Sequence, residues 1–110
     1  MNEQFYSSLD DLVATNGYSV DRPKGSAHPR YPEYIYPVNY GYINTTKSTD
    51  GAEIDAWIGT SGSSVTGIIA LDPVKGDSEM KVCIGCTQSE KSLALEANNR
   101  GTMTAILIDR

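Results

Sequence analysis

Charged side chains recur on strand-like segments and on the turns beside them in the middle of the chain, at positions where they could act together on one ligand. They are Asp50, Asp55, Asp77, Glu79 and Lys81. An acidic cluster of this kind needs cations to offset its charge. Because carboxylates and phosphate oxygens are both hard ligands suited to Mg²⁺, the cluster could hold a phosphate through divalent cations. The alternative is a solvated strand face, on which Glu79 and Lys81 form a weak surface pair.

Tyrosines lie just ahead of most of these acids, at alternate positions of the segment 34–42. They are Tyr34, Tyr36, Tyr40 and Tyr42. If this segment is extended, the four side chains point to one side together with Val38. They could form an aromatic stripe of the core or a contact between subunits. They could also present hydroxyl donors to a bound anion, and the sequence leaves these alternatives open.

The chain has 110 residues and a net charge of −5, with no block of basic residues. The length predicts a single domain, residues 1–110, with a modest core. Because nucleic-acid backbones are bound mainly by clusters of lysine and arginine, we expect no nucleic-acid partner. No apolar run approaches the length of a membrane span, and the acidic start MNEQFYSSLDD lacks the pattern of a secretory signal. We therefore expect a cytoplasmic protein without a membrane partner.

Two cysteines, Cys83 and Cys86, form the motif CIGC, and the chain has a single histidine, His28. A redox pair and half of a zinc site are the functional interpretations of the cysteines. Zinc usually takes four ligands, however, and the chain offers few others. We therefore favour small buried thiols in a reducing cytoplasm. His28 precedes a proline in a loop, where a histidine is more often solvated than catalytic.

Hydrophobic spacing predicts two helices and six extended segments. The helices are expected at residues 4–15 and from Thr87 to about Asn98, where Thr87 and Glu90 match a capping box. The extended segments are expected at 18–22, 34–42, 53–59, 65–71, 79–84 and 102–108. The proline-rich stretch 23–37 is expected to form a loop over the surface or over a site. This pattern predicts a small α+β domain, mainly β, built on a curled sheet or barrel.

Two adjacent motifs resemble the signature of the soluble family I inorganic pyrophosphatases. The sequence YPVNYGYI spans residues 36–43, and DGAEID follows at residues 50–55. In that family an Asn-Tyr-Gly-Tyr segment is followed at this spacing by an Asp-Gly-Asp-x-x-Asp motif. The flanking segments VDRP and DSEMKV are also similar to family elements, so the resemblance covers roughly residues 18–85.

The resemblance implies a five-stranded OB-like barrel with two short flanking helices, which forms a homo-oligomer. It implies hydrolysis of pyrophosphate, or of another small phosphorylated compound, with Mg²⁺ or Mn²⁺ as the cofactor. The implied metal ligands are Asp50, Asp55, Asp77 and Glu79. The implied phosphate ligands are Arg22, Tyr40 and Lys81, and Asp55, Tyr40 and Lys81 are also implied in catalysis.

The chain departs from the family at the acid that is implied to act on the attacking water, where it has Ala52. Glu53 is the nearest acid that could take this catalytic role, although in a regular strand its side chain would point the other way. Arg30, in the loop between Arg22 and Tyr40, could take over the phosphate contact of Arg22. Two hypotheses follow: a Mg²⁺-dependent phosphoanhydride hydrolase, and a non-catalytic module that binds metal and phosphate but has lost the acid.

Overall fold

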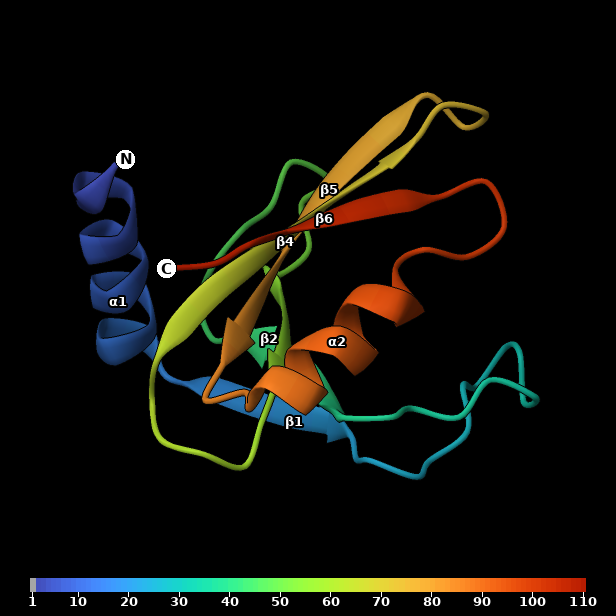
Figure 1. The fold of residues 1–110 in the computed structure, drawn as a ribbon, viewed down its shortest axis with the longest axis horizontal. Coiled ribbons are helices and arrows are strands. Elements are labelled where there is room, and N and C mark those ends of the chain that lie inside the picture. The colour runs from blue at the N-terminus through green and yellow to red at the C-terminus, as the bar shows by residue number, and fades with distance from the viewer. Residues whose placement is uncertain (1) are drawn as a thin grey trace.

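The computed structural model describes residues 2–110 and contains two helices and one sheet of six strands. The elements in chain order are α1 (Glu3–Asn16), β1 (Tyr18–Arg22), β2 (Asn39–Ile43), β3 (Asp55–Ile58), β4 (Val65–Asp72), β5 (Asp77–Ile84), α2 (Gln88–Ala97) and β6 (Thr104–Ile108). The strand order across the sheet is β1-β2-β3-β5-β4-β6 (Figure 1). Only β3 and β5 are parallel; the other neighbouring strands are antiparallel.

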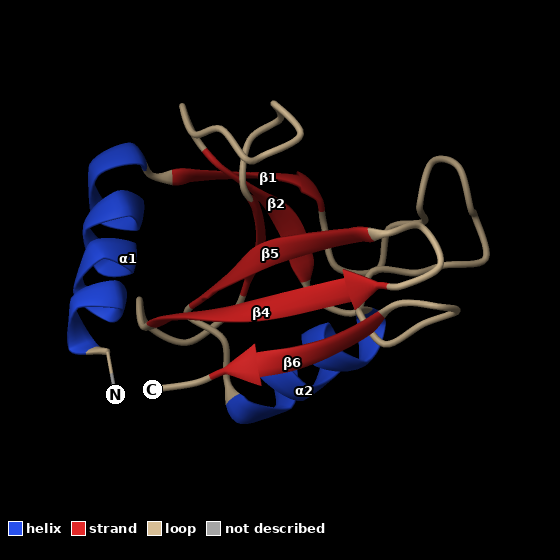
Figure 2. Ribbon diagram, turned by 90° about the horizontal axis from the view of Figure 1, so that it is seen from above, coloured by secondary structure: helices blue, strands red, loops and turns tan. Residues whose placement is uncertain are grey.

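The two helices cover different sides of the sheet (Figure 2). Successive residues of β5 alternate between the two apolar clusters, as the strand period of two requires. Val82 packs with Leu9 and Leu12 of α1, whereas Cys83 packs with Ala94 and Leu95 of α2. The alternation therefore gives the sheet a buried layer on each side, with one end of the α2-side layer left open to polar residues.

The second helix begins at the predicted cap. The Thr87 hydroxyl accepts the Glu90 N–H, and the Glu90 carboxylate accepts the Thr87 N–H. The same carboxylate also accepts the N–H and the hydroxyl of Thr60. Glu90 therefore ties the start of α2 to the loop after β3, and the predicted capping box is confirmed.

Gly41 in the NYGY motif is required because the backbone of β1 lies unusually close to its neighbour β2 at this position. A Cβ atom at this position would lie 1.8 Å from the Ser19 carbonyl oxygen, which no real contact allows. The glycine of the motif therefore serves the packing of the sheet.

The predicted small, mainly β class with two helices is confirmed, and a strand overlaps every predicted extended segment. Two details differ. The implied five-stranded barrel is an open six-stranded sheet, because β1 and β6 each pair with one neighbour only among the described residues. The strand predicted at 34–42 begins only at Asn39, since residues before it fold back in a loop that makes one isolated bridge, Ala27 to Ile35. Neither described helix combines the length and apolarity that crossing a bilayer demands.

Candidate functional site

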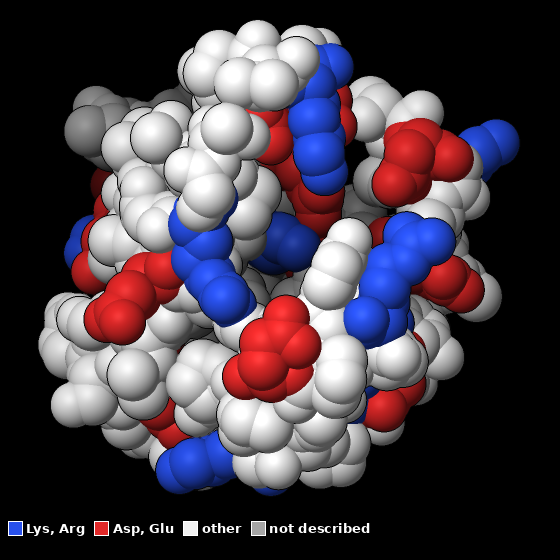
Figure 3. Space-filling model, turned by 90° about the vertical axis from the view of Figure 1, so that its right-hand side faces the viewer, with Lys and Arg blue, Asp and Glu red and all other residues white. Residues whose placement is uncertain are grey.

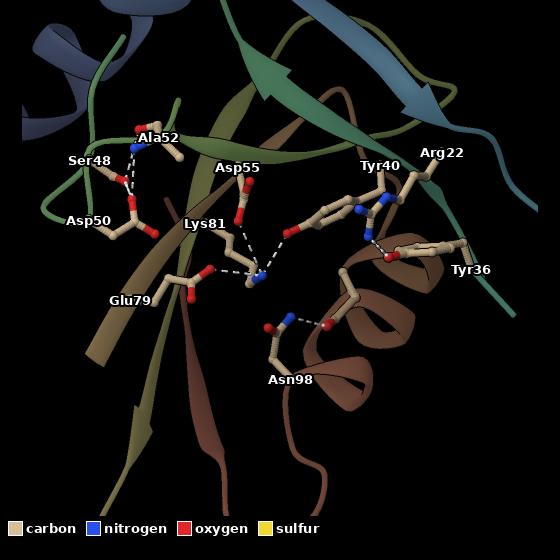
Figure 4. Close-up of polar contacts among 11 residues, drawn as sticks. Arg22, Tyr36, Tyr40, Ser48, Asp50, Ala52, Asp55, Glu79, Lys81 and Asn98 are labelled. Atoms are coloured by element: carbon tan, nitrogen blue, oxygen red, sulfur yellow. Dashed lines mark hydrogen bonds and ion pairs between the residues drawn. The ribbon is translucent and has the colours of Figure 1, made fainter. Parts of the chain in front are cut away.

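The ammonium group of Lys81 is the point at which several predicted site residues meet (Figure 4). Its Nζ lies 3.0 Å from Glu79 Oε1 and 3.6 Å from Asp55 Oδ2. It also donates a 2.6 Å hydrogen bond to the hydroxyl of Tyr40. Because an ammonium group cannot accept a hydrogen bond, the Tyr40 hydroxyl keeps its own hydrogen for a further acceptor.

Strand pairing explains why these side chains meet. Ala56 of β3 lies beside Val82 of the parallel strand β5, so the preceding residues Asp55 and Lys81 lie side by side on the other face. Tyr40 of β2 pairs with Trp57 of β3, two residues from Asp55 and on the same face. The three strands therefore bring a hydroxyl, a carboxylate and an ammonium group to one end of the α2-side layer.

The cluster is partly shielded from water: the Lys81 side chain is 14% exposed, against 38% for Asp55 and 48% for Glu79. Burial raises the pKa of Asp55, an effect that the charge of Lys81 only partly offsets. Burial also raises the pKa of Glu79, but the ion pair with Lys81 outweighs it and the net pKa is lowered. Burial, followed by the nearby Asp55 charge, raises the pKa of Tyr40 far above its ordinary value, so this phenol remains protonated.

Arg22 reaches the same region because of a bulge in β1. Val20 pairs with Gly41, whereas Arg22 pairs with Tyr40, so two residues of β1 oppose one step of β2. A bulge of this kind redirects the side chains that follow it. The Arg22 guanidinium donates a 2.6 Å hydrogen bond to the hydroxyl of Tyr36 and lies 5.7 Å from the centre of that ring.

A cavity of about 590 Å³ opens beside these residues, between the loop after β1, the β4–β5 turn and the segment after α2. Four of the nine lysine and arginine residues of the chain line it: Arg22, Lys75, Lys81 and Arg100. Only two acids line it, Glu33 and Asp72. Figure 3 shows this side of the molecule, where a hollow is bordered by lysine and arginine side chains. In an acidic chain, this local excess of positive charge is suited to an anion.

Asp72 is less available to a ligand than its position suggests. Its carboxylate accepts the N–H groups of Val74 and Lys75 and the hydroxyl of Thr102. Hydrogen bonds from the Lys75 N–H and its neighbours lower the pKa of Asp72. This acid therefore holds the β4–β5 turn against the segment after α2 and shapes the cavity wall.

The remaining predicted acids are not drawn into the Lys81 cluster. Asp50 accepts the hydroxyl of Ser48 and the N–H of Ala52, so it closes its own turn. Asp50 and Asp77 line a second, more apolar cavity of about 860 Å³ beside α1, which Glu79 also lines. Glu53 is exposed and precedes β3, so the strand argument about its direction does not apply.

Two of the four implied metal ligands, Asp55 and Glu79, lie at the same ammonium group. Among residues 2–110, no group of three or more His, Cys, Asp or Glu side chains is arranged to hold a metal ion. Mg²⁺ is, however, often bound by one or two carboxylates together with the phosphates of a substrate. Asp55 and Glu79 supply such a pair, and the four-acid set implied by the resemblance does not converge.

The two cysteines and the single histidine were the other residues whose types could do chemistry. Cys83 and Cys86 are free and buried, as predicted. The Cys86 thiol and burial raise the pKa of Cys83 far above its ordinary value. His28 is half-buried in this loop, and its Nδ1 accepts the N–H groups of Arg30 and Tyr31. Arg30 itself is exposed and lies outside the lining of the 590 Å³ cavity.

Several lining residues had no predicted role. Tyr36 belonged to the tyrosine stripe, but nothing in the sequence indicated that its hydroxyl would accept from Arg22. Lys75 and Arg100 come from turns more than twenty residues apart, and no spacing rule brings such positions together. The buried Asn98 donates to the Ala94 carbonyl and lies at the same wall. The only hint in the sequence was the presence of arginine and lysine residues in and beside the tyrosine-rich loop.

No protein-family model matches this sequence, and no curated protein matches it. Among solved structures, the chain is similar to an inorganic pyrophosphatase from Neisseria gonorrhoeae, with a TM-score of 0.51 and 20% sequence identity. The match covers 82% of this chain and 80% of that chain. The similarity shows a pyrophosphatase-like fold, in agreement with the predicted OB-like architecture, although the sheet of this chain stays open.

Proposed function

We propose that this chain is a Mg²⁺-dependent phosphoanhydride hydrolase that acts on pyrophosphate. The observation that carries the proposal is the meeting of Asp55 and Glu79 with Lys81, which lines a cavity rich in lysine and arginine together with Tyr40. The pyrophosphatase-like fold supports the same conclusion. Mn²⁺ could take the place of Mg²⁺, because both divalent ions prefer oxygen ligands such as carboxylates and water.

Phosphate binding falls to three side chains. Lys81 and Arg22 line the cavity from two different strands and can neutralise opposite sides of one anion. Tyr40, which stays protonated, can donate its hydroxyl hydrogen to a phosphate oxygen. In the hydrolytic step, Lys81 and Arg22 would offset the charge that grows on the departing phosphate.

Asp55 and Glu79 would hold the metal ion once the Lys81 ammonium moves from the carboxylates to the phosphate. When bound there, Mg²⁺ would polarise phosphoryl oxygens and lower the pKa of a coordinated water. The two carboxylates lie on neighbouring strands, so the sheet would fix their spacing. The proposal therefore gives Lys81 two partners in turn: the acids in the empty protein and the phosphate in the complex.

Phosphate release measured with wild type and Asp55→Asn, in Mg²⁺ and in Mn²⁺, tests the proposal. The wild type is expected to release phosphate from pyrophosphate with at least one of the two metals. Asp55→Asn is expected to lower the rate at least about ten-fold, because it removes one of two charged metal ligands. Background release by the wild type in both metals would sink the hydrolase assignment.

The second candidate function is binding of metal and phosphate without turnover. Ala52 favours it, because no carboxylate stands at the position that the resembled enzymes use for the attacking water. Calorimetry would then show Mg²⁺-dependent heat of pyrophosphate binding while the phosphate assay stays at background.

A further inference from the structure

The cavity beside Lys81 is larger than a pyrophosphate ion requires. Its volume of about 590 Å³ lies within the range of pockets that hold whole organic ligands, about 300–1,000 Å³. Two linked phosphate groups held by Lys81 and Arg22 would fill only one end of it. The other end is lined by Arg100, Lys75 and an aromatic wall, and nothing in the proposed hydrolysis of pyrophosphate uses them.

The aromatic wall is continuous from the Lys81 cluster to the far end of the cavity. The Lys81 Nζ lies 5.0 Å from the centre of the Tyr40 ring, and the Tyr40 and Tyr36 centres are 5.4 Å apart. The next step, from Tyr36 to Tyr34, is 5.1 Å. The guanidinium carbon of Arg100 lies 4.3 Å from the centre of the Tyr34 ring, close enough for a cation–π contact. A row of rings thus has a cation at each end.

A second pair of rings borders the same end. His28 lies 5.2 Å from Tyr31 and 6.2 Å from Tyr34, measured between ring centres. Tyr31 is 55% exposed, so one face of its ring is available to a ligand. Aromatic faces and planar guanidinium groups are the surfaces on which nucleobases stack in proteins. A wall of this kind beside a phosphate-binding end is the arrangement that a nucleotide needs.

We propose that the cavity binds a nucleoside phosphate, with its phosphates at Lys81 and Arg22 and its base against the wall formed by Tyr31, His28 and Tyr34. This inference rests on the proposed phosphate site and names a larger class of ligand for it. Lys75 and Arg100 would contact the sugar–phosphate linkage or a further phosphate. Because the net charge of the chain is −5, we expect a free nucleotide rather than a nucleic-acid strand as the ligand.

The test compares two kinds of ligand that share the same head group and resist hydrolysis. Methylenediphosphonate represents pyrophosphate, and the α,β-methylene analogues of adenosine and guanosine diphosphate represent nucleotides. Binding is followed by calorimetry at one fixed Mg²⁺ concentration, and the emission of Trp57 provides a second readout. Trp57 is the single tryptophan of the chain and it lines the cavity. At least one nucleotide analogue is expected to bind about ten-fold or more tightly than methylenediphosphonate, since base stacking adds to the phosphate contacts.

Tyr31→Ala separates the base from the phosphates. Because Tyr31 is mostly exposed, its truncation removes a stacking face without opening the core. The variant is expected to weaken nucleotide binding at least about five-fold more than methylenediphosphonate binding. Tyr18→Ala is the matched control, because Tyr18 is 45% exposed and lies outside the cavity lining. This control is expected to bind both ligands as the wild type does.

The outcomes distinguish this inference from the proposed function. If methylenediphosphonate binds and neither nucleotide analogue binds more tightly, the nucleotide inference is wrong and the pyrophosphate site stands. If Tyr31→Ala weakens both ligands equally, the placement of the base is wrong. If none of the three ligands binds in the presence of Mg²⁺, both the inference and the proposed function are overturned.

Discussion

The Lys81 ammonium on β5 donates a 2.6 Å hydrogen bond to the Tyr40 hydroxyl on β2, across the intervening strand β3. The contact joins the YPVNYGYI motif to the flanking segment DSEMKV, both of which belong to the resemblance to pyrophosphatases. It also places a cation next to Asp55, which lies on the strand between them. Among the described residues, this hydrogen bond lies where the carboxylates of Asp55 and Glu79 adjoin the cavity lined by lysine and arginine.

Arg22 rather than Arg30 should hold the phosphate. Arg22 lines the cavity after the bulge in β1, whereas Arg30 is exposed and lies outside the lining. Arg22→Ala is expected to weaken binding of methylenediphosphonate at least about ten-fold, because it removes a charged hydrogen-bond donor. Arg30→Ala is the matched control and should change the affinity less than about two-fold. Calorimetry measures both affinities. Equal losses of affinity in the two variants would show that the bulge in β1 gives Arg22 no special role in phosphate binding.

Ala52→Asp is expected to increase phosphate release from pyrophosphate at least about ten-fold over the wild type, because general base catalysis typically contributes more than this. Ala52 is exposed and donates its N–H to Asp50, so the turn can accept a longer side chain. The rate is measured with saturating Mg²⁺. Glu53→Gln, made in parallel, is expected to lower the wild-type rate if Glu53 supplies the proton acceptor. An unchanged rate in both variants would show that neither position lies near the attacking water.

Gly41→Ala should destabilise the protein by at least about 2 kcal/mol, since the new Cβ would overlap the Ser19 carbonyl oxygen of the neighbouring strand. Gly67→Ala is the matched control within β4. There, the nearest atom to a new Cβ is the flexible end of Met80 at 3.3 Å, so the expected cost is about 1 kcal/mol or less. Urea unfolding gives both free energies. Similar losses of unfolding free energy in the two variants would contradict the close approach of β1 to β2 at Gly41.

Glu90 should make stability depend on pH. Slight burial raises the pKa of Glu90, but the hydrogen bonds from Thr87 and Thr60 outweigh it and lower the net value. A carboxyl whose pKa is lowered by folding adds stability above its unfolded pKa of about 4.3, and this stability is lost as the pH falls through the folded pKa.

Glu90→Gln should therefore be less stable than the wild type at pH 7, by about 0.5–1 kcal/mol, and the two proteins should converge near pH 3. Urea unfolding at the two pH values checks this. Glu96→Gln, at an exposed position of the same helix, is the control. A constant difference between wild type and Glu90→Gln at both pH values would show that the carboxylate charge is not involved.

The alternation of residues was enough to predict which side chains share a face. Along β5, Lys81 and Cys83 point to one side and Val82 to the other, as the strand period requires. The capping box at Thr87 likewise follows from a local rule, because both of its hydrogen bonds lie within one helical turn. The fold class and the meeting of Asp55 with Lys81 could therefore be predicted from the sequence.

The cavity, in contrast, could not be predicted from the sequence. Its wall depends on the loop between β1 and β2, whose path is set by long-range contacts such as the stacking of Arg100 on Tyr34. The bulge that redirects Arg22 has no glycine or proline to announce it in the sequence VDR. Asp50 matched a motif position and Asp77 was a further candidate, but Asp50 closes its own turn, and both acids line the second cavity beside α1. Motif spacing alone cannot report such turns.

The most direct test of the account is the affinity of methylenediphosphonate for the wild type and for Lys81→Met in the presence of Mg²⁺. The change of Trp57 emission gives the dissociation constants. The account predicts measurable binding to the wild type and binding at least about ten-fold weaker for Lys81→Met, because that variant keeps the length of the side chain and removes the charge. Lys91→Met, at a lysine that pairs with Asp109 outside the cavity lining, should bind as the wild type does. Equal affinities of wild type and Lys81→Met, or no binding to the wild type, would contradict a phosphate site at Lys81.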